Sequence, residues 1–402
     1  HGVAVPFPAN AYQGGYVRDM ASQLTAAHGA KHVRSAVGLT AGIPGLPPAD
    51  RADDEARQQH EIHLDALIAR AKELLGADWT YVHQHALAEQ LADCRGDLEE
   101  FGVHFDVWFS EMALFDTGLV ARCVDLLGRN GHLYEQNGAR WFRSTAFGDE
   151  KDRVVQRENG VYTYFASDIA YHLNKFERGF DRIINIWGAD HHGYIPRVSG
   201  AVRALGLDAD KLHVALVQFA VLYRNGRKAS MSTRSGEFVT LRELRGEVGN
   251  DACRFFYALR KSDQHLDFDL DLAKSQTNEN PVYYIQYAHA RICSVMGQWG
   301  GDQAALAEAD LNLLDNPREL ALANQLAQFR EVIESAARDL APHMIAFYLK
   351  DLAGEFHAWY NAERMLVDDV ALRDARVALA AAVRQTIRNG MAVLGVSCPE
   401  SM

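Results

Sequence analysis

Two stretches of the sequence combine glycine, hydroxyl and charged side chains in patterns that suit nucleotide chemistry. The apolar run 183–187 ends in a Gly-Ala-Asp-His-His turn at 188–192, and a Ser/Arg/Gly loop at 230–236 follows a second apolar run, 214–223. A buried strand that opens onto such a turn is where an open α/β sheet holds a nucleotide. The polar loop can offer backbone N–H groups and cations to a triphosphate. Together the two stretches predict ATP chemistry on a doubly wound sheet.

The turn that contains Asp190, His191 and His192 admits a second interpretation, a metal site like that of phosphoesterases. Such a site needs further acidic and His ligands on neighbouring loops, and consecutive side chains diverge too much for one turn to supply three ligands. We therefore favour a nucleotide pocket, in which Gly188 allows close approach, Asp190 accepts hydrogen bonds from ribose hydroxyls and a histidine stacks or donates. One of the two histidines can also be purely structural.

The loop at 230–236 is basic as well as polar. It contains Ser230, Met231, Ser232, Thr233 and Arg234, and Arg227 and Lys228 precede it. A basic turn without function is the alternative, because the motif alone has low specificity. Its position after two strands of the predicted sheet favours phosphate binding.

Asp168 lies where the predicted strand 161–166 passes into the predicted helix 168–176. A carboxylate at that point can cap the helix. It can also face the crevice and bind a guanidinium, which favours a planar bidentate carboxylate. The sequence leaves both interpretations open.

Tyr284, Tyr287 and Arg291 have the spacing i, i+3, i+7 and therefore share one helix face. Aromatic residues at this spacing usually belong to a core. Tyrosine and arginine together on one face also make a platform on which unpaired bases can stack.

Alternating strands and helices must position these groups. The predicted strands are 103–109, 161–166, 183–187 and 212–223, with short strands around Trp141 and Val154-Val155. Helices are expected at 54–100, 119–127, 168–176 and 196–205. This alternation predicts a parallel sheet. Beyond 236 the periodicity is helical throughout, with a helix from Pro281 and three long apolar stripes at 322–340, 345–360 and 372–394. We place domain boundaries near residues 160, 225 and 279.

Composition limits the possible classes of protein. The 402 residues are 48% apolar and 23% charged, as in globular enzymes, and no apolar run is long enough to span a membrane. Five scattered cysteines lack the spacing of a zinc site or redox pair. The net charge of −12 disfavours nucleic-acid binding, but nine Lys/Arg against four Asp/Glu between 224 and 261 leave a local basic surface. The chain begins at His1, so we expect a fragment or a processed product.

Taken in order, these motifs and their neighbours resemble the arginyl-tRNA synthetases, a family of class I aminoacyl-tRNA synthetases. The resemblance covers essentially the whole chain. It rests on Phe105-Asp106-Val107-Trp108, Ser167-Asp168-Ile169-Ala170-Tyr171, Gly188-Ala189-Asp190-His191-His192-Gly193-Tyr194, Met231-Ser232-Thr233-Arg234-Ser235-Gly236, Asp251-Ala252-Cys253-Arg254-Phe255-Phe256, Leu266-Asp267-Phe268-Asp269-Leu270, Asn280-Pro281-Val282-Tyr283-Tyr284, Gln286-Tyr287-Ala288-His289-Ala290-Arg291 and the final Pro399-Glu400-Ser401-Met402.

The resemblance implies an α/β plus all-α fold, a partial class I Rossmann-like sheet with insertions followed by a helical anticodon-binding bundle. It implies four domains: 1–160, catalytic with connective insertions; 161–225, the second half of the catalytic domain; 226–278, the signature loop and stem-contact helices; and 279–402, the anticodon-binding bundle. Its reaction joins ATP, L-arginine and tRNA(Arg) into arginyl-tRNA with release of AMP and pyrophosphate. Mg²⁺ accompanies ATP, and no permanently bound cofactor or metal is expected. The expected protein is cytoplasmic, monomeric and not membrane-bound.

The resemblance also assigns roles to residues. Tyr164, Asp168 and His192 would bind arginine, and Gly188, Asp190, His191 and Gln218 would line the ATP site. Lys228 and Ser230, Met231, Ser232, Thr233 and Arg234 would form the catalytic signature loop that stabilises the departing pyrophosphate. Tyr284, Tyr287, Arg291 and Met402 would bind tRNA.

Two departures from the family pattern matter. The loop lacks both lysines of the class motif, and the His-x-Gly-His motif occurs nowhere in the 402 residues. The family carries that motif upstream of the position that matches His1, together with an additional tRNA-contacting domain. We therefore expect the C-terminal two-thirds of an arginine–tRNA ligase, inactive on its own. The alternatives are a non-catalytic tRNA-binding module or paralogue and a metal-dependent phosphoesterase.

Overall fold

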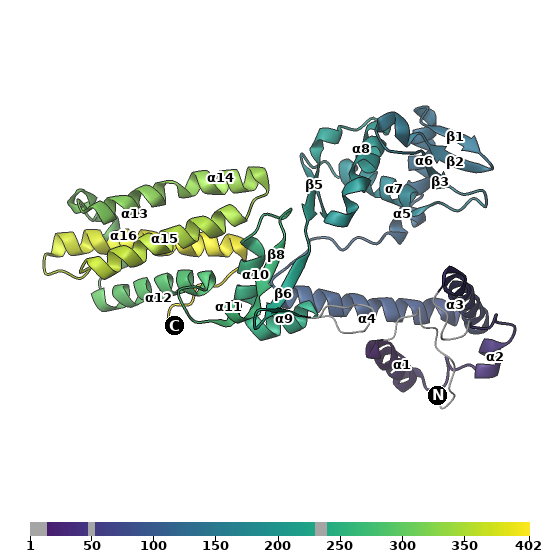
Figure 1. Cartoon of the computed structure of the whole chain (residues 1–402), viewed down its shortest axis with the longest axis horizontal. Helices are drawn as coiled ribbons and strands as arrows, with labels where there is room; N and C mark the ends of the chain where they lie inside the picture. The colour runs from purple at the N-terminus through teal and green to yellow at the C-terminus, as the bar shows by residue number, and fades with distance from the viewer. Residues whose placement is uncertain (1–13, 47–52, 230–238) are drawn as a thin grey trace. The chain divides into compact units, whose positions relative to one another are not determined.

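The computed structural model describes residues 14–46, 53–229 and 239–402 and divides into two compact units (Figure 1). The first unit holds the described residues up to His104 together with Val239. The second unit holds 105–229 and 240–402.

The first unit is helical. Its helices are α1 (Gly15–His28), α2 (Ala36–Thr40), α3 (Asp54–Leu75) and α4 (Asp78–Glu100), so the prediction of helices over 54–100 is confirmed. The Asp53 carboxylate begins α3 by accepting a hydrogen bond from the backbone N–H of Ala56 at 2.8 Å. An unpaired helix-start N–H is satisfied in this way, which explains why α3 starts there.

The second unit opens with a small α/β region. Its elements are α5 (Met112–Asp116), α6 (Leu119–Arg129), β1 (Leu133–Gln136), β2 (Ala139–Phe142), η1 (Ser144–Phe147), β3 (Arg153–Gln156), α7 (Tyr164–Glu177), β4 (Ile183–Gly188), η2 (Ala189–Tyr194), α8 (Ile195–Ala204), η3 (Ala209–Lys211) and β5 (Leu212–Val217). Strands β1, β2 and β3 form an antiparallel sheet, and β4 pairs in parallel with β5. The buried faces of α6 and α7 supply most of the core of this region.

Two predicted strands in this region are wrong. Residues 103–109 form no strand, and within 161–166 only Tyr162 makes an isolated bridge, to Gln156, before α7 begins at Tyr164. Phe165 and Ile169 are buried one helical turn apart, so the apolar run belongs to the inner face of α7. Periodicity alone cannot separate a short apolar run in a strand from one in a helix.

The predicted strand 212–223 is also divided. After β5, the backbone N–H of Gln218 donates to the carbonyl of Ser262 at 2.8 Å, and the chain continues as β6 (Ala220–Arg224) in another sheet. There β6 pairs antiparallel with β7 (Arg227–Lys228) and parallel with β8 (Leu266–Asp269). The sequence stays mostly apolar between β5 and β6, so hydrophobic periodicity gives no sign that the strand is interrupted.

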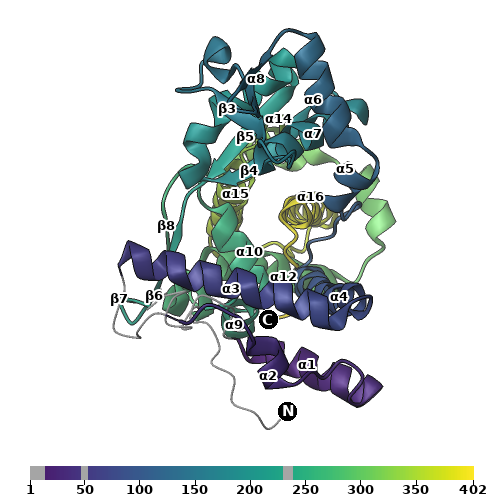
Figure 2. The same ribbon diagram turned by 90° about the vertical axis from the view of Figure 1, so that its right-hand side faces the viewer.

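Helices make up the rest of the second unit. They are α9 (Leu241–Val248), α10 (Asn250–Ala258), α11 (Leu270–Lys274), α12 (Pro281–Trp299), η4 (Gln303–Glu308), η5 (Leu311–Leu313), α13 (Pro317–Ala327), α14 (Phe329–Asp339), α15 (His343–Ala362) and α16 (Val370–Leu394). The long helices run side by side in Figure 1, and α16 is seen nearly end on in Figure 2. The stripe predicted over 322–340 is two helices that meet at Gln328. None of the described helices has the length and apolarity needed to cross a bilayer.

Candidate active site

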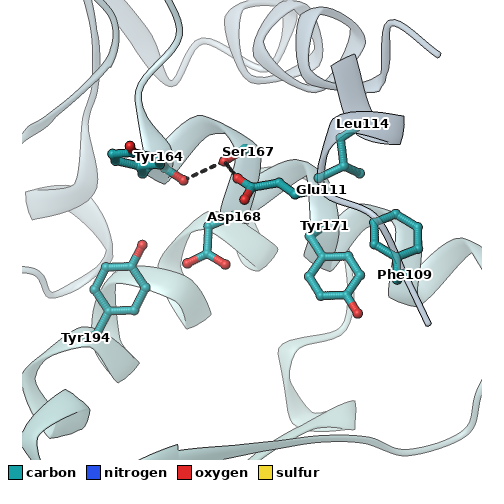
Figure 3. A pocket seen from close by; sticks show the side chains of 8 residues that line it. All are labelled: Phe109, Glu111, Leu114, Tyr164, Ser167, Asp168, Tyr171 and Tyr194. Atoms are coloured by element: carbon teal, nitrogen blue, oxygen red, sulfur yellow. Dashed lines mark hydrogen bonds between the residues drawn. The ribbon is translucent and has the colours of Figure 1, made fainter. Parts of the chain in front are cut away.

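A cavity of about 380 Å³ lies between α7 and the segment that leads into α5 (Figure 3). It is lined by Phe109, Glu111, Leu114, Tyr164, Ser167, Asp168, Tyr171 and Tyr194. Helix α7 supplies four of these residues, and Tyr194 comes from the end of η2. The helical spacing of Tyr164, Asp168 and Tyr171 explains why they share this face.

Two carboxylates belong to this pocket. Asp168 points into it, and 34% of its side chain is exposed (Figure 3). Glu111 is held by Ser167, whose hydroxyl donates to Glu111 Oε1 at 2.6 Å. Because α7 begins at Tyr164 with Thr163 at the cap position, Asp168 is the fifth residue of the helix and does not cap it. The open question about Asp168 is thereby decided in favour of the crevice.

Tyrosines form the walls on either side of Asp168. Burial, and then the charge of Asp168, raise the pKa of Tyr194 far above its usual value, so its phenol stays protonated. Tyr171 stacks on Phe109 with ring centroids 4.7 Å apart. Tyr164 lines the pocket although 87% of the residue is exposed.

A buried polar chain supports α7 from behind. His172 Nδ1 lies 2.8 Å from the carbonyl oxygen of Asp168, and Asn185 Nδ2 donates to His172 Nε2 at 2.7 Å. Lys175 Nζ completes the chain at 2.7 Å from Asn185 Oδ1. A carbonyl can only accept, so Nδ1 carries a proton, and an amide NH2 can only donate, so Nε2 carries none and the ring is neutral. Burial lowers the pKa of His172, which agrees with a neutral ring.

The residues predicted to line the ATP site lie at the carboxyl edge of the β4–β5 sheet. Gly188 ends β4 opposite Val217 in register, which brings Gln218 to the same edge. A Cβ on Gly188 would overlap the Asp190 carboxylate, so the glycine gives that side chain room above the turn. Asp190 and His191 are exposed, and His191 Nε2 lies 3.7 Å from Asp190 Oδ2. His192 is exposed too, and it does not line the pocket that holds Tyr164 and Asp168.

Most of the signature loop lies outside the described residues, namely Ser230, Met231, Ser232, Thr233 and Arg234. Lys228 is described and exposed in β7. In the described part of the chain, no three His, Cys, Asp or Glu side chains come together as metal ligands.

The predicted tRNA-binding residues divide between two surfaces. Arg291 Nη2 donates to the Tyr287 hydroxyl at 2.6 Å, and its guanidinium lies 4.5 Å from the ring centre of Tyr360. Tyr284 packs against His357, with ring centroids 4.5 Å apart. Met402, 54% exposed, instead lines a hollow of about 760 Å³ beside α9, α10 and α12. The structure therefore groups Tyr284, Tyr287 and Arg291 but not Met402.

The sequence interpretation missed Glu111 and Tyr194 as pocket residues. Glu111 is recognised through Ser167, which is 56 residues away. No local pattern could reveal that pair. Tyr194 ends the Gly-Ala-Asp-His-His-Gly-Tyr motif, so the motif marks the segment but not the pocket that this side chain lines.

Comparisons with known proteins give consistent matches for both halves of the chain. A family model described as tRNA synthetases class I (R), catalytic domain, matches residues 83–273, and one described as DALR anticodon binding domain matches 285–402. The arginine–tRNA ligase of Dechloromonas aromatica is 84% identical over 402 residues, which are the whole chain and 68% of that protein. The arginine–tRNA ligase of an Azoarcus strain is 72% identical over the same shares.

Solved structures agree. A putative arginyl-tRNA synthetase from Campylobacter jejuni has a TM-score of 0.81 at 30% identity, covering 100% of this chain and 78% of that one. The Thermus thermophilus arginyl-tRNA synthetase matches with a TM-score of 0.66 at 24% identity, over 87% of this chain and 68% of that one, and shows the shared fold. The predicted combination of an α/β region and a helical bundle is confirmed.

Proposed function

Because this chain belongs to the arginyl-tRNA synthetase family, we propose that it supplies the arginine pocket, part of the ATP site and the anticodon-binding surface of an arginine–tRNA ligase. The observation that carries the proposal is the pair of carboxylates, Asp168 and Glu111, in one cavity with aromatic walls. Family membership decides against the phosphoesterase interpretation of the Asp-His-His turn.

Arginine recognition fits the pocket chemically. A guanidinium is planar, always charged and able to donate several hydrogen bonds, and a carboxylate can accept two of them side by side. The Asp168 carboxylate can face a substrate because it does not cap α7. Tyr164 and Tyr171 would cover the alkyl stem and the faces of the guanidinium. His192 does not line the pocket, so we propose that it contacts arginine only after the substrate has bound.

ATP would bind at the carboxyl edge of β4 and β5, together with Mg²⁺ as part of the substrate. Gly188, Asp190, His191 and Gln218 would hold adenosine, and Lys228 with the loop Ser230–Met231–Ser232–Thr233–Arg234 would face the pyrophosphate. The arginine carboxylate attacks the α-phosphorus, a new O–P bond forms and pyrophosphate leaves. A ribose hydroxyl of tRNA(Arg) then attacks the carbonyl carbon, and AMP leaves. No enzyme nucleophile is needed, so the protein contributes positioning and charge stabilisation.

The tRNA would lie along the helical part of the second unit. Tyr284, Tyr287 and Arg291 would offer aromatic faces and a cation for unpaired anticodon bases. Met402 would contact the tRNA from its separate surface. The domain boundaries near 160, 225 and 279, a monomeric state and a cytoplasmic location complete the proposal.

Substitution of Asp168 tests the arginine pocket. Asp168→Asn keeps the size of the side chain but loses the charge, so arginine binding should weaken by about 2 kcal/mol, or roughly thirtyfold in dissociation constant. Isothermal titration calorimetry of L-arginine into the full 402-residue chain measures this. Asp181→Asn removes an exposed carboxylate outside the pocket and should leave the affinity unchanged.

Two results would count against the proposal. Equal arginine affinity of Asp168→Asn and the unsubstituted chain would mean that the guanidinium binds elsewhere. tRNA binding without any arginine binding would favour the non-catalytic module.

A further inference from the structure

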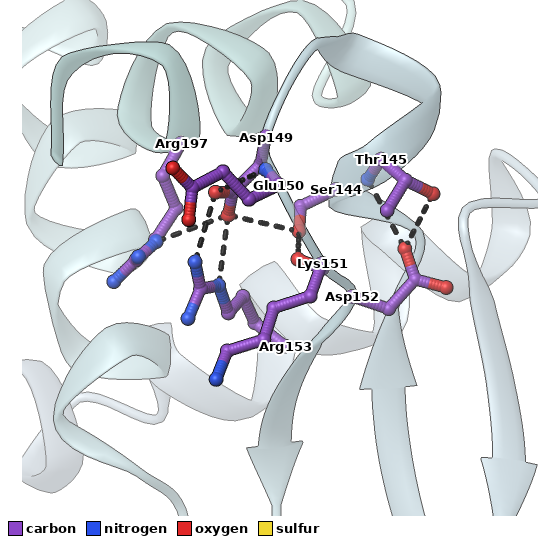
Figure 4. Close-up of polar contacts among 8 residues, drawn as sticks. All are labelled: Ser144, Thr145, Asp149, Glu150, Lys151, Asp152, Arg153 and Arg197. Carbon is purple, nitrogen blue, oxygen red and sulfur yellow. Dashed lines mark hydrogen bonds and ion pairs between the residues drawn. The ribbon is translucent and has the colours of Figure 1, made fainter. Parts of the chain in front are cut away.

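A buried polar cluster lies outside the arginine pocket, where η1 meets α8 (Figure 4). At its centre is Asp149, whose side chain is 3% exposed and accepts hydrogen bonds from Arg153 Nε at 2.8 Å and Nη2 at 2.9 Å. The backbone N–H of Glu150 donates to the same carboxylate at 2.8 Å. The hydrogen bonds from Arg153 hold the pKa of Asp149 well below its usual range. A charged carboxylate is therefore fixed at this point.

Arg197 connects this cluster to the pocket. Its Nε donates to Asp149 Oδ2 at 3.1 Å, and its guanidinium carbon lies 4.8 Å from the ring centre of Tyr194. Three residues further along α8, a Cβ on Gly200 would lie 2.6 Å from Phe147 Cβ, so the helix backbone packs directly on η1. Packing and charge together fix the start of α8.

Tyr194 is held at that start. Its ring meets Phe165 and Trp187 edge to face, with centroid distances of 6.1 and 5.7 Å. The Arg197 guanidinium packs over the face of the same ring. The Tyr194 hydroxyl points toward the Asp168 carboxylate, and both side chains line the same pocket (Figure 3). A protonated phenol that faces a carboxylate can donate a hydrogen bond to it.

We propose that Tyr194 is a positioning residue for arginine specificity, which orients the Asp168 carboxylate for a planar guanidinium and is itself held in place by the Arg197–Asp149 pair. This inference rests on the proposed function, since it concerns the same pocket.

The chemical consequence is selective. A guanidinium needs the carboxylate plane at a defined angle to donate two parallel hydrogen bonds. An ammonium is a point charge that can donate to the carboxylate from many directions. A donor that fixes the orientation of Asp168 therefore strengthens arginine binding more than lysine binding. The Ser167–Tyr171 motif, from which Asp168 is proposed to bind arginine, gives no role to Tyr194.

The variant Tyr194→Phe removes the hydroxyl and keeps the ring on its three neighbours. We expect arginine affinity to fall about tenfold and lysine affinity by less than about twofold, so that the preference for arginine narrows. Calorimetric titration of both amino acids into the full chain measures it. The control is Tyr348→Phe, which removes a hydroxyl that donates to the Gln325 carbonyl at 2.8 Å in the helical bundle. It should leave both affinities unchanged.

Arg197→Met tests the second half of the proposal. Asp149 keeps Arg153 and the Glu150 N–H in this variant, so the cluster remains paired. We expect Arg197→Met to narrow the preference for arginine in the same direction. In the double variant with Tyr194→Phe it should add little, because Arg197 acts through the tyrosine.

The outcomes separate the inference from the proposed function. If the unsubstituted chain binds no arginine, both are overturned. If it prefers arginine and Tyr194→Phe keeps the same preference, only the role of Tyr194 is overturned. If the effects of Arg197→Met and Tyr194→Phe on the preference for arginine add in full, Arg197 does not act through Tyr194. The proposed role of the Arg197–Asp149 pair is then overturned.

Discussion

We expect the stability of the second unit to depend on pH through the buried His172. Burial lowers its pKa below the ordinary value of 6.5, with a smaller contribution from the charge of Lys175, while Asp168 opposes the shift. Between the lowered pKa and 6.5 the unfolded chain binds more protons than the folded chain, so stability falls as the pH drops through this window. Protonation of Nε2 would also abolish its hydrogen bond from Asn185.

We expect the free energy of unfolding to decrease from pH 7 to pH 5 less in His172→Gln than in the unsubstituted chain. A glutamine oxygen can still accept from Asn185 but does not titrate in this range. Denaturant titrations at both pH values measure the difference, and the buried His289 and His357 are present in both proteins. An equal loss in the two proteins would assign the pH dependence elsewhere.

At the residue scale, the sequence predicts pocket residues that belong to a recognisable motif better than pocket residues contributed by a distant segment. Asp168 is a candidate from its position near a helix start, and the start of α7 at Tyr164 excludes the capping role and leaves the carboxylate in the lining of the pocket. Glu111 could not be predicted, because its partner Ser167 is distant in the sequence. Hydrogen bonds between remote segments leave no periodic signal.

At the element scale, a buried ion pair ties the helices of the bundle together. Glu319 of α13 is fully buried and accepts from Arg376 Nε of α16 at 2.8 Å, and Arg376 Nη1 donates to the Arg364 carbonyl at 2.7 Å. Arg376→Met leaves a buried carboxylate without its partner, which should destabilise the second unit by about 3–5 kcal/mol.

Chemical denaturation followed by circular dichroism would measure that loss. Arg330→Met, which breaks the exposed pair of Arg330 and Glu334 on α14, is the matched control and should cost about 0.5 kcal/mol or less. Glu319→Leu combined with Arg376→Met should recover part of the loss, because no charge stays buried. Equal costs for Arg376→Met and Arg330→Met would contradict the account.

Helices were predicted more reliably than strands, for a physical reason. The long stripes of α15 and α16 repeat over several turns, whereas the strands of the α/β region have four to six residues, too few to show a period clearly. The run 161–166 was misread because α7 is apolar on the face it turns to α6. The break between β5 and β6 depends on pairing with β8, a segment more than forty residues later.

At the scale of the whole molecule, an acidic chain is proposed to bind a polyanion. The net charge is −12, so attraction to tRNA must come from locally basic parts of the sequence such as the stretch 224–261. Binding of tRNA(Arg) to the 402-residue polypeptide should therefore weaken steeply as salt rises, because bound cations are released from the phosphates. Affinity that ignores ionic strength would contradict a phosphate-tracking surface.

The same polypeptide should form no arginyl-tRNA even where it binds arginine and tRNA. Its 402 residues contain no His-x-Gly-His motif, and Asp190 and His191 at the edge of β4 are open to solvent, so charge that develops on the α-phosphate would be met by water instead of fixed donors. Preorganised donors at the reacting phosphate supply much of the acceleration in such reactions. Aminoacylation with labelled arginine, ATP and tRNA(Arg) measures this, with the salt titration confirming that tRNA is bound. Robust turnover would mean that the described edge of the sheet, with Lys228 and the loop beyond it, suffices for adenylate formation.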